Sequence, residues 1–164
     1  VCQGDLYKTI KKWGCQVNTK KEPLKPGMTF EFKYKVPEDK TVPHLFPDIA
    51  EAQAMPEVFA TGVLVGLFEF ACIKAINPHI DWPREQTVGI GIQIDHTAAT
   101  PPNFTVTVKG TLTHVEGRKL TFSLEADDGV DTISKGVHDR FIIDAEKFNA
   151  QVKKKGEKHG KHHE

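Results

Sequence analysis

The chain of 164 residues is long enough for one domain with one buried core and too short for two ordinary domains. A hydrophobic fraction of 38% and ten phenylalanines predict a folded globular protein and exclude a disordered chain. Lysine plus arginine and aspartate plus glutamate balance at 22 each, so neither nucleic acid nor an anionic membrane is expected as a partner.

Residues 1–25 form an N-terminal extension. Leu6, Ile10 and Trp13 recur there at helical spacing, which predicts a short amphipathic helix. Docking of this helix on its own domain is favoured over a membrane surface or a partner. The sequence begins at Val1, which is compatible with a removed targeting segment; otherwise the cytoplasm is the default expectation.

Residues 26–154 are expected to form the folded domain. Apolar side chains alternate with polar ones from Met28 to Val36, which predicts a strand with one solvated face. Three prolines and several polar residues then exclude regular structure over residues 37–55, so we expect a long functional loop there, such as a lid.

A helix is predicted to begin at Pro56 and to end before Asn77 and Pro78. Its residues are apolar on nearly every side, so it should be enclosed by the rest of the domain. The stretch is interrupted by Thr61, Glu69 and Lys74, which argues against a membrane span.

The remainder of the domain has the alternating pattern of strands. These are expected at residues 87–96, 104–113, 118–126 and 130–143, with turns at Gly117 and Gly129 joining the later ones as hairpins. A strand, a buried helix and an antiparallel meander indicate an α+β domain in which one sheet wraps one long helix, as in the hot-dog fold. Residues 155–164 are basic and rich in histidine; we expect a disordered tail there and no functional metal site.

Glu69 is the least expected residue, because an ionised carboxylate in an enclosed helix requires partners. Lys74 is about 140° away around the helix, so the partner must come from another element. Thr61 lies eight positions earlier and could border the same cavity. The alternatives stay open: a helix threonine often bonds its own backbone, and a helix glutamate is more often structural than catalytic.

His96 follows Val88, Ile90, Ile92 and Ile94 at period two, which places its imidazole on their apolar face. It is either a core histidine or the edge of a ligand site formed with the small-residue loop after it.

Two further positions are weaker candidates. Arg140, near the end of the last strand, is either a surface ion pair or part of a site. Gly89 and Gly91 are expected on the face opposite the isoleucines, where they would let backbones pack closely.

Several segments resemble the fluoroacetyl-CoA thioesterase family, in order and with matching spacings. They are residues 55–62, 65–72, 96–102, 115–118, 128–131 and 146–150, within a resemblance that covers roughly residues 26–154. The resemblance implies a hot-dog homodimer whose active sites lie near the subunit interface. It also implies catalytic roles for Thr61, Glu69 and His96, and substrate-binding roles for Gly89 and Arg140.

Ala52 and Met55 mark a departure from the family. They stand where the family's fluoroacetyl enzyme carries two phenylalanines of a hydrophobic gate, so these two positions are also expected to face the acyl group. The resemblance therefore implies hydrolysis of a small acyl-CoA, with no cofactor beyond the coenzyme A of the substrate. The departure argues against selectivity for fluoroacetyl and leaves the acyl group open. The alternatives are a hot-dog hydratase acting on enoyl- or hydroxyacyl-CoA, and a non-catalytic acyl-CoA-binding module.

Overall fold

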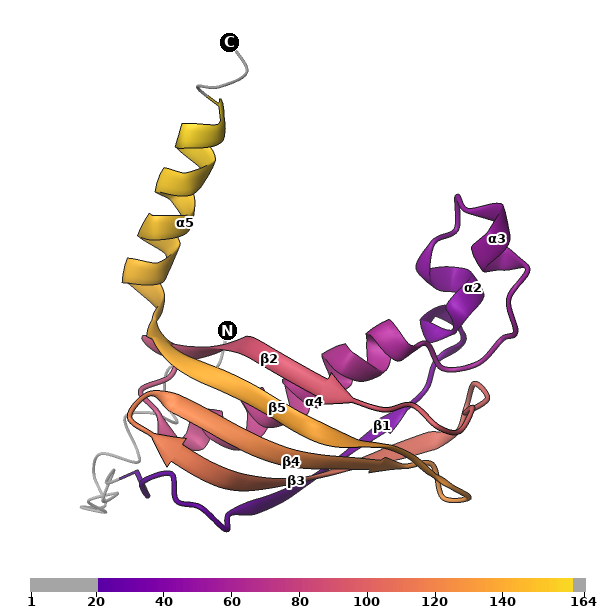
Figure 1. Ribbon diagram of the computed structural model, residues 1–164, viewed down its shortest axis with the longest axis horizontal. Helices are drawn as coiled ribbons and strands as arrows, with labels where there is room; N and C mark the ends of the chain where they lie inside the picture. Colours follow the sequence, from indigo (N-terminus) through magenta and orange to yellow (C-terminus); the bar gives the residue numbers. More distant parts are fainter. Residues whose placement is uncertain (1–20, 161–164) are drawn as a thin grey trace, which may run out of the picture.

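The computed structural model describes residues 21–160 (Figure 1). Its elements are, in chain order, β1 (Thr29–Lys35), η1 (Glu38–Lys40), α2 (Val42–Leu45), α3 (Ala50–Gln53), α4 (Thr61–Ile76), η2 (Asn77–His79), β2 (Glu85–Ile94), β3 (Thr105–Glu116), β4 (Lys119–Asp127), β5 (Thr132–Asp144) and α5 (Ala145–Gly160). The helix predicted around Leu6, Ile10 and Trp13 lies outside the described residues, and residues 21–25 are in neither helix nor strand.

The five strands form one antiparallel sheet in the order β1-β3-β4-β5-β2. The two predicted hairpins are confirmed: Gly117 and Gly129 have φ of 58° and 91°, the left-handed region that glycine adopts without steric cost. Both β1 and β2 are edge strands, and β2 lies between the two parts of the chain that project from the sheet, α5 at one end and the α2–α3 segment at the other (Figure 1).

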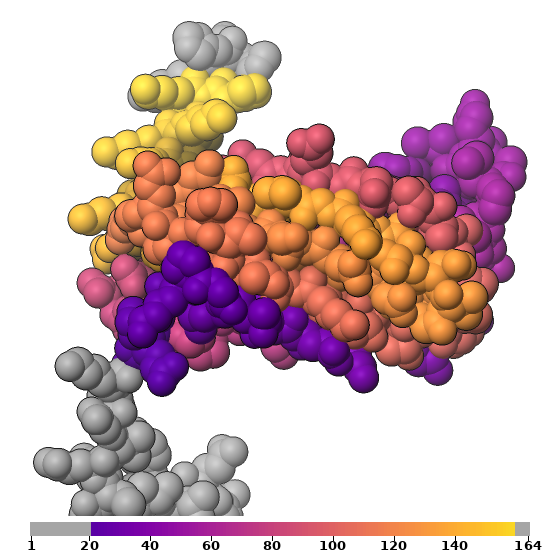
Figure 2. All heavy atoms as spheres, turned by 60° about the horizontal axis from the view of Figure 1, so that its bottom comes forward, coloured from indigo at the N-terminus to yellow at the C-terminus, as the bar shows by residue number. Residues whose placement is uncertain are grey.

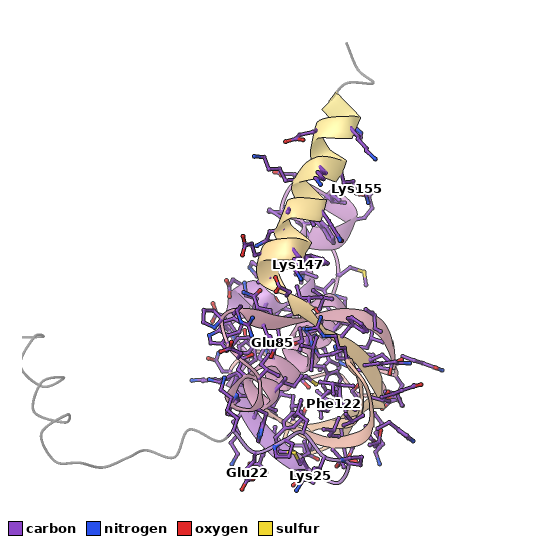
Figure 3. The ribbon with its side chains drawn as sticks, turned by 90° about the vertical axis from the view of Figure 1, so that its left-hand side faces the viewer. Glu22, Lys25, Glu85, Phe122, Lys147 and Lys155 are labelled. Atoms are coloured by element: carbon purple, nitrogen blue, oxygen red, sulfur yellow. The ribbon has the colours of Figure 1, made fainter. Side chains whose placement is uncertain are left out.

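The core lies between the sheet and α4. Leu64, Phe68, Cys72 and Ile76 recur every fourth residue and are fully buried, so this stripe of α4 faces the sheet. Phe122 of β4 lies inside the body of the domain (Figure 3). The α+β prediction of one sheet around one long helix is confirmed.

The expectation that α4 is enclosed on every side is wrong for the single chain. Phe70 is 49% exposed, although its ring packs edge-on against Phe32 of β1 and Lys74 lies over both rings. By length and composition the stretch Thr61–His79 could also cross a membrane, a test that core helices of soluble proteins pass. Here it packs on the sheet.

The helix begins at Thr61 and not at Pro56. Backbone hydrogen bonds hold the preceding residues in extended form: Val42 N–H donates to Val58 O, and Phe59 N–H donates to Thr100 O. The loop predicted over residues 37–55 is only partly confirmed, because it contains the short helices η1, α2 and α3. This lid segment (residues 37–59) protrudes at the end of the domain where α4 begins (Figure 2).

The predicted disordered tail is wrong for residues 155–160, which continue α5. Lys155 stands on the part of this helix that is clear of the sheet, whereas Lys147 lies near its base (Figure 3). Good helix formers such as Ala145, Lys153 and Lys158 outweigh the solvation expected for a charged segment.

Gly136 of β5 pairs with Ile94 of β2, and the α-carbon of Gly136 lies close to the β2 backbone. A β-carbon at this position would lie 2.1 Å from Gln93 O and 2.7 Å from Ile94 Cα. We therefore expect Gly136→Ala to lower the free energy of unfolding by about 1–3 kcal/mol, because two strands must separate. Urea unfolding measures this.

The matched control is Gly156→Ala in α5, where an added β-carbon meets nothing within 4 Å. This variant should gain about 0.5–1 kcal/mol, because alanine favours helix over glycine. Equal unfolding midpoints for Gly136→Ala and the unmodified protein would contradict the close approach.

Candidate active site

Thr61 and His96 meet at the first turn of α4. Thr61 Oγ1 lies 2.9 Å from His96 Nδ1, and the two residues come from α4 and from the loop after β2. Pairing with β5 continues past the end of β2, since Asp95 N–H donates to Lys135 O and Thr97 N–H donates to Ile133 O. This extended backbone fixes the direction of the imidazole between them.

The environment of His96 favours the neutral imidazole. Burial lowers its pKa, and the charge of Asp95 opposes this effect. Asp95 does not orient the ring, because its Oδ1 accepts the Lys135 N–H at 2.6 Å. Within residues 21–160, His96 Nε2 is buried without a hydrogen-bond partner, so it is available to a group from outside this part of the chain.

A pocket of about 230 Å³ opens over this pair. It is lined by Val42, Val58, Phe59, Thr61, His96, Thr97, Ala98 and Ala99. In the first turn of α4, Val63 N–H and Leu64 N–H donate to Ala60 O, whereas the N–H groups of Thr61 and Gly62 point toward the N-terminal end of the helix and favour a developing negative charge there.

Ala52 and Met55 do not line this pocket. They lie in α3 and directly after it, and the side chain of Met55 is exposed. The structure therefore places them in the lid segment but does not bring them to Thr61 and His96.

Glu69 lies elsewhere on α4 and finds its partner on β5. Its Oε1 is 3.5 Å from Arg140 Nη1, so the partner does come from another element. The carboxylate is not enclosed, because the Glu69 side chain is 42% exposed, whereas that of Arg140 is 2% exposed. The buried guanidinium thus holds a half-exposed carboxylate at the surface of the domain.

The buried Arg140 is held by two residues that the sequence patterns did not single out, Thr87 and His138. Arg140 Nε donates to Thr87 Oγ1 at 3.0 Å, its Nη2 donates to Thr87 O at 2.8 Å, and its Nη1 donates to His138 Nε2 at 3.0 Å. Thr87 and His138 could have been found in the sequence as polar residues at inward-facing positions of alternating strands.

Gly89 leaves room for the Glu69 carboxylate. A β-carbon on Gly89 would lie 2.2 Å from Glu69 Oε1, so any larger residue would displace that oxygen. The expectation that Gly89 lies opposite the isoleucines is wrong, because a β-bulge at Ile90 shifts the alternation. Gly89, Ile92 and Ile94 share the face toward α4, whereas Gly91 and Val88 lie on the other face.

The Thr61–His96 pair and the Glu69–Arg140 pair are separate within one chain. Thr61 contacts His96, and Glu69 lies eight residues after Thr61 on α4, about 12 Å further along the helix axis. Two groups this far apart cannot act on the same carbonyl carbon.

Other reactive groups do not compete with these. Burial raises the pKa of the Cys72 thiol to about 12, so it remains protonated and is a poor nucleophile. Among residues 21–160, no group of three or more His, Cys, Asp or Glu side chains could hold a metal ion.

Comparisons with known proteins place this site in a family. The model of the family "Fluoroacetyl-CoA-specific thioesterase" matches residues 22–146. The fluoroacetyl-CoA thioesterase of Streptantibioticus cattleyicolor is 48% identical over 135 residues, which are 82% of this chain and 96% of the relative.

Solved structures agree with this match. A structure of the fluoroacetyl-CoA thioesterase, 48% identical, superposes with a TM-score of 0.79 over 82% of this chain and 98% of the other. A thioesterase-superfamily protein from Thermus thermophilus is 25% identical, with a TM-score of 0.73 over 84% and 96% of the two chains. A hot-dog-like protein from Thermanaerovibrio acidaminovorans, 18% identical, has a TM-score of 0.67 over 79% and 91% and confirms the fold alone. The chain thus belongs to the fluoroacetyl-CoA-specific thioesterase family and is an acyl-CoA thioesterase of the hot-dog fold.

Proposed function

We propose that the protein hydrolyses the thioester of small acyl-CoA molecules with Thr61, Glu69 and His96. The observation that carries this assignment is the 2.9 Å contact between Thr61 Oγ1 and His96 Nδ1 at the first turn of α4. Acyl transfer requires a nucleophile, a proton carrier and donors for the oxyanion. The pocket offers the hydroxyl, the imidazole and the free N–H groups of a helix N-terminus together.

His96 is the proton carrier in this proposal. Its lowered pKa keeps the imidazole neutral near pH 7, so it can accept a proton from the attacking group and return it to the departing thiolate of coenzyme A. Glu69 supplies the carboxylate, which either attacks the carbonyl carbon or activates the attacking water. Neither route requires a metal or an organic cofactor.

The working unit is proposed to be a homodimer joined through β2. This ten-residue strand is a free sheet edge, and Ile90 and Ile92 on it are 54% and 38% exposed. Long apolar edges are protected by pairing in stable proteins. The exposed apolar side of α4 has the same explanation, because a helix that is apolar all round is covered in its working assembly.

The dimer would also complete the site. If two copies of β2 pair in antiparallel fashion about a point midway between Gly89 and His96, each Gly89 lies across from His96 of the partner subunit. The Glu69 of one protomer then approaches the Thr61–His96 pair of the other. The buried His96 Nε2, which has no partner in residues 21–160, would face this approaching group.

Mixing two inactive variants tests the shared site. Thr61→Ala and Glu69→Gln protomers, refolded together at equal concentration, should recover roughly one quarter of the wild-type kcat per protomer. Half of the dimers are mixed, and each mixed dimer has one intact site of two. Release of free thiol from acetyl-CoA measures the recovery.

The control mixture is Thr61→Ala with His96→Ala, whose lesions fall in the same pair. It should recover no activity, because both sites of every mixed dimer are damaged. Equal activity in the two mixtures, or full activity of Glu69→Gln alone, would contradict the proposal.

The pH dependence of kcat/KM tests His96 as the base. The active form is the neutral imidazole, so the rate should fall as pH decreases, with its inflection below the ordinary value of 6.5. Asp95→Asn keeps an oxygen for the Lys135 N–H but removes the opposing charge, and should move the inflection to lower pH. His114→Leu, on the exposed surface of β3, serves as the control and should leave it in place. An inflection above 6.5 in the unmodified protein would argue against His96.

The acyl group is proposed to be small, without strong preference for fluorine. A structure of the 48% identical thioesterase contains fluoroacetate and CoA, but the lid of this chain has Ala52 and Met55 in place of the aromatic gate. We expect kcat/KM for fluoroacetyl-CoA and acetyl-CoA to differ by less than about 100-fold, the discrimination that an apolar pocket achieves for one small substituent. A panel of acyl-CoA esters assayed for thiol release measures this.

The panel also tests the two alternatives. Hydration of crotonyl-CoA without thiol release would indicate a hydratase, and binding of acyl-CoA without turnover would indicate a binding module. The family match favours neither.

A further inference from the structure

His138 is a buried histidine that the proposed reaction does not use directly. It is 1% exposed and lies on the face of β5 that is turned toward α4, two residues before Arg140. Its Nε2 is 3.9 Å from Glu69 Oε1, beyond hydrogen-bonding distance. His138 therefore does not hold the carboxylate itself.

The two hydrogen bonds of His138 determine its protonation state. Nδ1 lies 2.8 Å from Gly91 O, which can only accept, so Nδ1 carries the hydrogen. Nε2 lies 3.0 Å from Arg140 Nη1, which can only donate, so Nε2 carries a lone pair. The ring is thus the neutral Nδ1–H tautomer. Burial lowers the pKa of His138 and the charge of Arg140 acts in the same direction, which together outweigh the opposing effect of the hydrogen bond to Gly91 O.

The neutral His138 ring fixes the orientation of the Arg140 guanidinium. A guanidinium fixed only by Thr87 would be held along one edge, through Nε and Nη2. His138 fixes the remaining nitrogen, Nη1, which is also the nitrogen nearest to Glu69 Oε1. The position of Nη1 therefore sets the position of the carboxylate oxygen.

The anchor of His138 is the backbone beside the β-bulge. Gly91 O, which accepts from Nδ1, follows the bulged residue Ile90, and the His138 ring also passes within 3.2 Å of a β-carbon built on Gly89. The bulge, the histidine and the guanidinium thus form one connected support beneath Glu69.

We propose that His138 is a positioning residue of the thioesterase, which transmits the geometry of the β2 bulge to Glu69 through Arg140. The inference rests on the proposed function, because it assigns a role to a residue that acts only through Glu69. It predicts that losing the acceptor at position 138 misplaces the carboxylate without removing it.

Replacing His138 by Leu tests this, because leucine has similar bulk and offers no acceptor to Arg140. We expect kcat to fall on the order of 10- to 100-fold while KM changes less than about 3-fold, as for a misplaced catalytic group. His138→Gln, whose amide oxygen can accept from Arg140, should retain several times more activity than His138→Leu. Hydrolysis of acetyl-CoA and urea unfolding are measured on the same preparations.

A double-mutant cycle separates positioning from structural damage. In an Arg140→Met background, His138→Leu should cause little further loss of kcat, because its route to Glu69 is already gone. Additive losses in the cycle, or equal kcat in His138→Leu and the unmodified protein, would overturn the inference. If His138→Leu does not fold, His138→Gln replaces it in the same double-mutant cycle with Arg140→Met. Additive losses of kcat in that cycle would also overturn the positioning role of His138.

Failure of the proposed function is recognisable by itself. If Glu69→Gln keeps full activity, then Glu69 has no catalytic role and the proposed function fails, whatever His138→Leu does. If Glu69→Gln is inactive and His138→Leu is fully active, only the positioning role fails.

Discussion

The buried guanidinium of Arg140 is the constraint on which the organisation of this domain depends. A cation that is 2% exposed cannot remain inside a protein without partners, because its desolvation costs several kcal/mol. Thr87 and His138 supply neutral acceptors, and Glu69 supplies the opposite charge. Meeting this requirement ties β2, β5 and α4 together at one point.

The same constraint explains why β2 is irregular. Gly89 must lack a side chain because the Glu69 carboxylate occupies that space, and the bulge at Ile90 turns Gly91 O toward His138. The register shift also places Ile92 and Ile94 on the inner face, so that His96 emerges on the side where Thr61 begins α4. One irregularity in an edge strand thus positions both polar pairs.

In the proposed homodimer, the separation of the two pairs links catalysis to assembly. The Thr61–His96 pair and Glu69 lie about 12 Å apart along α4, and β2, which runs beside them, is an apolar edge of the sheet. An edge that pairs with a second copy of itself would be protected from aggregation and would bring the two halves of the site together. In this view the stability of the dimer and the activity of the enzyme have the same physical origin.

The sequence by itself determined the fold class, the order of the five strands and α4, and the candidate residues. Period-two alternation identified the strands and an apolar run identified α4, because burial on one face or all round leaves a direct trace in the residue pattern. It also identified Glu69 as a carboxylate that needs a partner from elsewhere. Local signals failed at the start of α4, where Pro56 appeared suitable but hydrogen bonds from Val42 and Phe59 hold the chain extended.

Only the tertiary structure decided which groups meet. Strand register and the β2 bulge decide these contacts, because a shift of one residue moves every following side chain to the other face. They make Arg140 the partner of Glu69 and bring Thr87 and His138 to Arg140. They also bring His96 to Thr61. Such contacts join residues up to 71 positions apart in sequence, as for Glu69 and Arg140, so no local pattern encodes them.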